Sequence, residues 1–146
     1  MGVDEGCLTR PGMTRSRRVL VIDDEPEARV VLGELLSIWG YDVETAQDAK
    51  HALEIVITQE PDMIVSDLAL RGGDPCTIIR RLRAHAAEQV YIIAFSGWYF
   101  LRDAALAAGA DAFILKPRID ELERLLAGGK VAASEPAAAS SKRRRP

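Results

Sequence analysis

Four short apolar runs in this chain each end at a polar residue, and this pattern limits the fold more than any other feature. The runs cover residues 19–22, 63–66, 92–95 and 113–115. The polar residues that follow them are Asp23, Asp24, Asp67, Ser96 and Lys116. Strands of a parallel sheet that is covered on both faces are continuously apolar in this way. Because ligands bind outside the carboxyl ends of such strands, we expect the five polar side chains to converge on one crevice.

The segments between these runs have the spacing of amphipathic helices. We expect helices from Pro26 until Gly40, from about Asp48 until Pro61, from Asp74-Pro75 to about Ala87, from Leu101 to Ala108, and from Ile119 until Gly128-Gly129. A fifth strand is expected at Tyr41–Thr45, where apolar and polar residues alternate as in a half-buried edge strand. Strands that alternate with helices at this spacing imply right-handed crossovers and a parallel sheet with helices on both faces.

Helical periodicity also predicts which side chains face the core. Val31 belongs to the apolar face of the first helix, and Ile57 belongs to that of the second. In the third helix Arg80, Arg81 and Arg83 are expected to face water, because the apolar residues occupy the opposite side.

Length and charge favour one acidic domain between two basic ends. A chain of 146 residues can bury a core without disulfides, and we expect Cys7 and Cys76 to be free thiols in a reducing compartment. Residues 1–17 are expected to form a flexible arm and residues 128–146 a disordered basic tail. The span 19–127 carries ten basic and nineteen acidic residues, which argues against direct DNA binding. No stretch reaches the roughly 18 apolar residues of a membrane span, so we expect a cytoplasmic protein.

The five converging groups suit the transfer of a phosphoryl group. Three carboxylates at one site repel one another unless a cation is present, and a small number of oxygen ligands suits Mg²⁺, which retains several waters. Lys116 adds a positive charge for a phosphate oxygen, and the Ser96 hydroxyl can donate a hydrogen bond to another. Asp67 is then the nucleophile, because carboxylates form covalent acyl phosphates and phosphoryl transfer mainly requires alignment and charge stabilisation.

The motifs that carry these residues resemble the receiver domain of bacterial two-component response regulators. The similar segments are Val19–Pro26 with its acidic pair, Asp67-Leu68, Phe95-Ser96-Gly97 and Gly109–Pro117. The resemblance covers residues 18–127, which we expect to be the receiver domain. It implies a flavodoxin-like, doubly wound α/β fold with a five-stranded parallel sheet of order 2-1-3-4-5 and five helices.

The resemblance also implies a role for each site residue. Asp67 would accept a phosphoryl group from a phosphohistidine. The ligands of Mg²⁺ would be Asp23, Asp24, Asp67 and the backbone carbonyl of Ala69. Ser96 and Phe113 would act as a switch that couples the site to the face of the fourth and fifth strand–helix units. The implied partners are a sensor histidine kinase or a histidine phosphotransfer protein, and a downstream protein target. No membrane partner is expected, and a homodimer through the same face remains open.

Four positions depart from the pattern of this family. Arg71 stands where the family usually has proline, and Arg118 stands where an aromatic residue commonly follows Lys-Pro. Ala69 and Trp98 are apolar where many relatives carry polar side chains that orient the hydrolysing water. We therefore predict slow self-dephosphorylation and no other enzymatic turnover.

Three consecutive aromatic residues, Trp98, Tyr99 and Phe100, allow two interpretations. They could pack locally, or they could form an exposed surface for a protein partner, because Trp and Tyr are typical interface anchors. His51 and His85 lack companion ligands and are expected at the surface. The basic run Lys142–Arg145 is expected to be solvated.

Our interpretation is a stand-alone receiver that signals by phosphorylation-dependent protein binding, because the nineteen residues beyond Ala127 are too few for an output domain. One alternative is a phosphorylation-independent adaptor with the same fold. The other is an Mg²⁺-dependent phosphohydrolase with an aspartyl nucleophile. Such a hydrolase needs a general acid two residues after the nucleophile, where Ala69 cannot serve.

Overall fold

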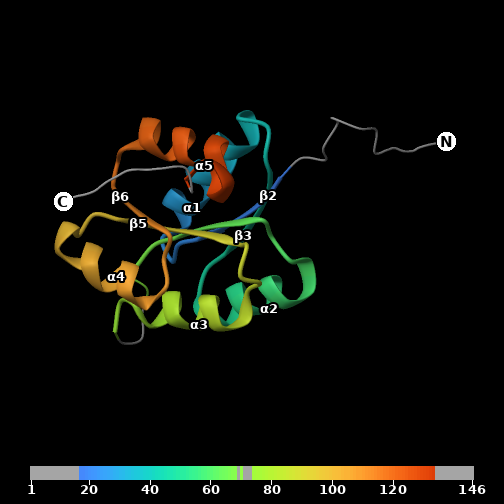
Figure 1. The fold of residues 1–146 in the computed structure, drawn as a ribbon. Coiled ribbons are helices and arrows are strands. Elements are labelled where there is room, and N and C mark those ends of the chain that lie inside the picture. The colour runs from blue at the N-terminus through green and yellow to red at the C-terminus, as the bar shows by residue number, and fades with distance from the viewer. Residues whose placement is uncertain (1–16, 69, 71–73, 134–146) are drawn as a thin grey trace.

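The computed structural model describes residues 17–68, 70 and 74–133, which form one five-stranded sheet with helices on both faces (Figure 1). In spatial order the strands are β3 (Asp42–Ala46), β2 (Arg18–Ile22), β4 (Met63–Ser66), β5 (Tyr91–Ser96) and β6 (Ala112–Leu115). All neighbouring strands pair in parallel. Counted along the chain the order is 2-1-3-4-5, so the predicted doubly wound fold is confirmed.

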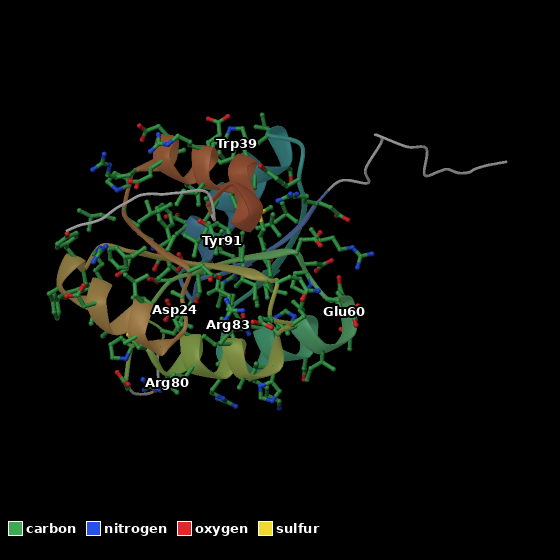
Figure 2. The ribbon with its side chains drawn as sticks, in the orientation of Figure 1. Asp24, Trp39, Glu60, Arg80, Arg83 and Tyr91 are labelled. Carbon is green, nitrogen blue, oxygen red and sulfur yellow. The ribbon has the colours of Figure 1, made fainter. Side chains whose placement is uncertain are left out.

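Helices connect the strands and form a layer on each side of the sheet. They are α1 (Pro26–Ile38), α2 (Ala49–Gln59), α3 (Thr77–His85), a 3₁₀ turn η1 (Tyr99–Leu101), α4 (Arg102–Ala108) and α5 (Ile119–Ala133). Helices α1 and α5 cover one face, and α2, α3 and α4 cover the other (Figure 1). Trp39 at the end of α1 and Arg80 on α3 accordingly lie on opposite sides of the sheet (Figure 2).

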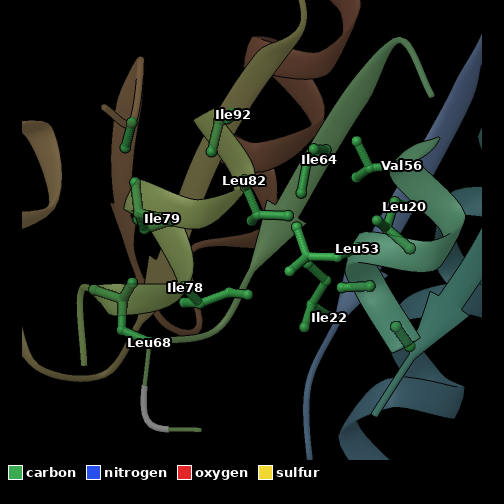
Figure 3. Close-up of a cluster of buried hydrophobic side chains, with 14 of the residues drawn as sticks. Leu20, Ile22, Leu53, Val56, Ile64, Leu68, Ile78, Ile79, Leu82 and Ile92 are labelled. Carbon is green, nitrogen blue, oxygen red and sulfur yellow. The ribbon is translucent and has the colours of Figure 1, made fainter. Parts of the chain in front are cut away.

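The alternation of strand side chains produces two apolar cores. The core beneath α2, α3 and α4 contains Leu20, Ile22, Leu53, Val56, Ile64, Leu68, Ile78, Ile79, Leu82 and Ile92 (Figure 3). The core beneath α1 and α5 takes the intervening strand residues, among them Val19, Val21, Val65 and Ile93. The central strands are therefore buried on both faces, which explains why their sequences are continuous apolar runs.

The register of the strands aligns their carboxyl ends. Ile22 pairs with Ser66, so the residues that follow β2 and β4 leave the sheet at the same edge. Ser96 pairs with Leu115, and the N–H of Lys116 donates to the Ser96 carbonyl at 2.9 Å. The polar residues that follow the strands therefore lie together at the carboxyl ends of the strands, as the apolar runs predict.

The start of α3 differs from the prediction, which placed Pro75 at the first helical position. The helix begins at Thr77 because Asp74 closes a turn before it. The Asp74 carbonyl accepts the Thr77 N–H at 3.0 Å, and its carboxylate accepts the Cys76 N–H at 3.4 Å. Arg80 forms an ion pair with the same carboxylate, and its hydrogen bond is the main reason that the pKa of Asp74 lies below its usual value.

The end of α5 also differs from the prediction. The helix continues through Gly128-Gly129 to Ala133, so the predicted end of this helix was wrong. A glycine in a helix interior costs about 1 kcal/mol relative to alanine, which is too little to stop a helix by itself. Good helix formers on both sides of the pair, including Leu126 and Ala132, offset this cost.

Two side chains that were predicted to face the core point to solvent. Val31 on α1 is 64% exposed and Ile57 on α2 is 61% exposed. In α1 the helix approaches the sheet through the buried Gly33, where an added Cβ would lie 3.4 Å from the Thr45 side chain. This close approach turns Val31 away from the sheet. In each of these two helices, fewer side chains are buried than the apolar spacing of the sequence predicts.

Arg83 was predicted to face water, but its side chain connects three segments at the amino ends of β5 and β6 (Figure 2). Its guanidinium donates to the Asp111 carboxylate at 2.6 Å and to the carbonyls of Val90 and Gly109 at 3.1 and 3.2 Å. Asp111 also accepts the Ile92 N–H at 2.9 Å. We call these five residues the Arg83–Asp111 cluster.

The remaining predictions about the surface concern scattered residues. His51 and His85 are exposed, as predicted. Cys76 is a free, buried cysteine, and burial raises the pKa of its thiol. Cys7, residues 1–16 of the arm predicted at residues 1–17, and the basic run Lys142–Arg145 lie outside the described residues. In the part of the chain that the structure describes, every helix is too short or too polar to cross a bilayer.

Candidate functional site

Asp67 belongs to a cluster of three carboxylates at the carboxyl ends of β2 and β4. One carboxylate oxygen from each of Asp23, Asp24 and Asp67 lies within 4.8 Å of the other two. Asp23 is 3% exposed and Asp67 is 9% exposed, whereas Asp24 is partly exposed at the solvent side of the cluster. Such a group of hard oxygen donors, open to water on one side, fits Mg²⁺, which uses one or two carboxylates and retains several waters.

Lys116 brings a positive charge into the carboxylate cluster. Its Nζ lies 3.3 Å from Asp23 Oδ2 and 3.7 Å from Asp67 Oδ1. The same ammonium group lies 5.6 Å from the centre of the Phe95 ring, which attracts cations through its face. Three contacts therefore hold the lysine over the site, although it comes from the opposite end of the sequence. A cation in this position can neutralise a phosphate oxygen on Asp67.

Backbone hydrogen bonds fix the two buried aspartates. Asp23 Oδ1 accepts the Glu25 N–H at 2.9 Å, and Arg29 on α1 donates to the Asp23 carbonyl at 2.8 Å. The Ser66 hydroxyl donates to the Asp67 carbonyl at 2.9 Å. Arg29 and Ser66 were not predicted as site residues, because an arginine in the first turns of a helix and a serine at a strand end carry no distinctive signal.

Ser96 is fully buried at the end of β5, and its hydroxyl faces the next loop. Ser96 Oγ accepts the backbone N–H of Trp98 at 3.0 Å. The backbone carbonyl of Ser96 is joined to Lys116 by the hydrogen bond described above. Ser96 thus connects the loop that follows β5 with the lysine of the site.

The three aromatic residues after Ser96 are exposed, which favours the second of the two interpretations above. Trp98, Tyr99 and Phe100 are 54%, 63% and 73% exposed. Trp98 and Phe100 meet edge to face with ring centres 5.7 Å apart. Tyr99 meets Phe113 on β6 in the same way at 6.1 Å, and Phe113 is only partly buried. We call Trp98, Tyr99 and Phe100 the aromatic patch.

Three of the positions that depart from the family pattern follow site residues closely in sequence. Ala69, predicted to supply a carbonyl ligand, and Arg71 lie outside the described residues. Arg118 is exposed and lies 3.7 Å from Glu121 in the first turn of α5.

The arrangement provides each group that phosphoryl transfer requires. Asp67 offers a carboxylate oxygen as the nucleophile, and the neighbouring acids can hold a divalent cation. Lys116 supplies a fixed positive charge for the oxygens of the transferred group. The structure therefore brings Asp23, Asp24, Asp67 and Lys116 together and links Ser96 to them through the backbone.

Comparison with known proteins points to one family. The model of the response regulator receiver domain matches residues 19–127. The response regulator MprA of Mycolicibacterium vanbaalenii is 36% identical over 111 residues, which are 75% of this chain and 47% of that protein. The probable transcriptional regulator ycf27 of Porphyridium aerugineum is 34% identical over 103 residues, which are 70% of this chain and 43% of that protein. The chain spans about half the length of these relatives.

Solved structures show the same fold. The response regulator TrrA of Thermotoga maritima, in complex with Mg²⁺ and BeF, has a TM-score of 0.67 and 28% identity, and covers 74% of this chain and 94% of that one. The receiver domain of the sensor histidine kinase PA1611 of Pseudomonas aeruginosa, with a magnesium ion in its active-site cleft, has a TM-score of 0.68 and 29% identity. That match covers 76% of this chain and 94% of the other.

Proposed function

Since this chain belongs to the receiver-domain family of response regulators, we propose that it accepts a phosphoryl group on Asp67 and signals by phosphorylation-dependent protein binding. Receiver domains are signalling modules of two-component systems. The observation that carries the proposal is the position of Lys116 Nζ, 3.3 Å from Asp23 and 3.7 Å from Asp67 within the carboxylate cluster. A lysine that served only as a solvated loop residue would not be expected to lie between two buried carboxylates.

The proposed transfer uses a phosphohistidine as donor. An oxygen of Asp67 attacks the phosphorus, the bond between phosphorus and the imidazole nitrogen breaks, and an acyl phosphate forms. Asp23, Asp24 and Asp67, with the Ala69 carbonyl, would hold Mg²⁺, which neutralises charge on the phosphoryl oxygens when it is bound. Lys116 orients one of these oxygens. The donor is a sensor histidine kinase or a histidine phosphotransfer protein.

The readout of phosphorylation involves Ser96 and the aromatic patch. When the Ser96 hydroxyl turns to donate to the new phosphate, it can no longer accept the Trp98 N–H that it binds at 3.0 Å. The loop that carries the aromatic patch then repacks together with Phe113, which touches Tyr99. This is a population shift between two packings, whose size is limited by the difference in phosphate contacts. The repacked patch is the contact for the downstream protein.

The acyl phosphate should be long-lived. The side chains at Ala69 and Trp98 cannot orient an attacking water, because neither carries a group that accepts its proton. Self-dephosphorylation of the purified protein is therefore slow. A phosphoryl half-life of seconds would contradict this expectation.

Intact-mass measurement tests the phosphorylation directly. The parent protein and Asp67→Asn are incubated with Mg²⁺ and acetyl phosphate, and both are weighed. The parent should gain the mass of one phosphoryl group and the variant none. Equal gain would place the acceptor elsewhere. No gain in the parent, together with unchanged binding to a protein partner, would instead identify a phosphorylation-independent adaptor.

Tryptophan fluorescence tests the readout. Trp98 and Trp39 are the two tryptophans, so Trp39→Phe leaves Trp98 as the reporter. Acetyl phosphate with Mg²⁺ should change the Trp98 emission in this background, and the change should disappear when Ser96→Ala is added. A change that persists without the Ser96 hydroxyl would remove the proposed link through the Trp98 N–H.

A further inference from the structure

An open groove runs along the junction of helix α1 and the edge strand β3, on the side of the sheet that faces α1. The groove has a volume of about 530 Å³. Val30, Ile38, Val43 and Thr45 line it, and Gly33 forms part of its floor. Val30 is 55% exposed and Ile38 is 79% exposed. Two large apolar side chains thus stand open to solvent beside a groove whose floor is also apolar.

The strand at this groove has an unused edge. Among the residues that the structure describes, β3 pairs with β2 alone and ends the sheet on that side. The Asp42 N–H donates toward β2, to the Arg17 carbonyl, at 2.9 Å. Because backbone groups of alternate residues point to opposite sides of a strand, the N–H and C=O groups of Val43 and Thr45 point outward. An edge of this kind is a template for a further strand.

The charges at the edge select the kind of strand that can add. The side chains of Asp42 and Glu44 are exposed on the face of β3 opposite the groove, where both line a small pocket. Arg18 lies in the same pocket, but its guanidinium donates to the Gln59 carbonyl at 2.6 Å. Glu34 adds a third acid at the rim of the groove. Asp42 and Glu44 outnumber Arg18, so this face of the edge carries a net negative charge. The groove face is mainly apolar, and the charges of Arg29 and Glu34 in its lining are opposite.

From these features we infer that β3 is a docking edge for an extended segment of a protein partner in which apolar residues alternate with lysine or arginine. In an added strand, alternate side chains point to opposite faces. The apolar set enters the groove beside Val30 and Ile38, and the basic set lies beside Asp42 and Glu44. Backbone hydrogen bonds to Val43 and Thr45 provide affinity, as in other cases of strand addition.

A second copy of this chain fits the edge poorly. Pairing of two β3 strands would bring Asp42 and Glu44 of one copy beside the same residues of the other, and like charges opposite each other destabilise a sheet. The acids thus act against self-association and in favour of a basic partner.

The docking edge lies next to the phosphorylation site but does not depend on it. Arg29 lines the groove, and its guanidinium donates to the Asp23 carbonyl at 2.8 Å. The groove is nevertheless formed in the unphosphorylated structure, so partner binding there can be tested on the unmodified protein. Failure of this inference would leave the reaction at Asp67 untouched.

A labelled peptide in which valine and lysine alternate is the probe. Its binding to the full chain is measured by fluorescence anisotropy at physiological ionic strength, and hydrogen exchange follows the amides of Val43 and Thr45. We expect saturable binding and slower exchange at both amides. Ile38→Ser and Glu44→Lys should each weaken binding about tenfold. Ile38→Ser removes an aliphatic contact that the bound peptide would bury, and Glu44→Lys reverses a charge that would attract the basic side chains of the peptide.

Matched controls separate strand addition from non-specific attraction. Ile57→Ser removes an aliphatic side chain of similar exposure from α2 and should leave the affinity unchanged. A peptide of alternating valine and glutamate, and a valine–lysine peptide with N-methylated backbone, should not bind. Absence of saturable binding, equal binding of the control peptides, or insensitivity to Ile38→Ser would overturn the inference. Self-association of the parent that Ile38→Ser abolishes would assign the edge to a second copy instead.

Discussion

Replacement of Asp67 by asparagine should stabilise the protein when no divalent cation is present. Asp67 has a carboxylate oxygen within 4.8 Å of those of Asp23 and Asp24. At an effective dielectric constant of about 20, each such pair repels by about 3.5 kcal/mol, so the two pairs together cost about 7 kcal/mol. The substitution also removes the attraction to Lys116 Nζ at 3.7 Å. That attraction is about 4.5 kcal/mol on the same scale, which leaves a net gain of about 2 kcal/mol.

Urea unfolding in the presence of EDTA measures this difference. The control is Asp103→Asn on α4, because that side chain is 92% exposed and its ion pair with Arg102 should contribute little. We expect Asp67→Asn to raise the free energy of unfolding while the control changes it by less than about 0.5 kcal/mol.

Titration with Mg²⁺ should reverse the order of the two proteins. A cation at a hundred times its dissociation constant adds about 2.7 kcal/mol to the parent. Asp67→Asn should gain much less, because it has lost one of the three carboxylates. A variant that is no more stable than the parent in EDTA, and that gains as much from Mg²⁺, would refute the electrostatic account of the site.

Other predictions concern the scaffold. Burial, with a smaller contribution from Asp111, raises the pKa of Tyr91 from 10.0 to about 12. Tyr91 therefore ionises at a lower pH in the unfolded chain than in the folded one, and the free energy of unfolding should fall as the pH rises from about 10 to 12. Urea unfolding at about pH 9 and pH 11 should show a loss of about 1 kcal/mol that Tyr91→Phe lacks, and an identical loss in both proteins would contradict this. Arg83→Met should lower the free energy of unfolding by about 2 kcal/mol, because it removes the ion pair with Asp111 and the hydrogen bonds to two backbone carbonyls. The double variant with Asp111→Asn should lose less than the sum of the two single changes. Gly109→Ala should lower the melting temperature, because Gly109 has a φ of 125° and a Cβ there would lie 2.9 Å from Arg83 Cβ; unchanged melting would show that the loop can move.

The sheet and the site could be predicted from sequence because both follow from one property of parallel strands. Strands that are buried on both faces have continuously apolar sequences, which can be recognised directly. Because the strands are parallel, the residues that follow them lie together at the carboxyl ends of the sheet. Asp67 and Lys116 are 49 positions apart in sequence, yet this rule alone brings them to the same place.

The features that could not be predicted depend on how each helix is rotated about its axis and on contacts between residues that are far apart in sequence. Val31 fits the apolar spacing of α1, but Gly33 sets the angle at which the helix meets the sheet. In the sequence, Arg83 cannot be distinguished from other arginines on a polar helix face. Its partner Asp111 precedes a different strand, and only the fold brings the two side chains together. The hydrogen bond from Trp98 to Ser96 depends on the path of a loop, which no periodic pattern encodes.

The Arg83–Asp111 cluster sits where β5 and β6 begin, while Ser96 and Lys116 follow their ends. Each of these two strands is therefore anchored where it begins and followed, where it ends, by a residue of the proposed site. Substitutions in the loops that follow the strands should change the surroundings of Ser96 and Lys116 while the anchorage keeps the fold intact. Divergence in this lineage should consequently concentrate at one rim of the molecule, with the opposite rim changing little.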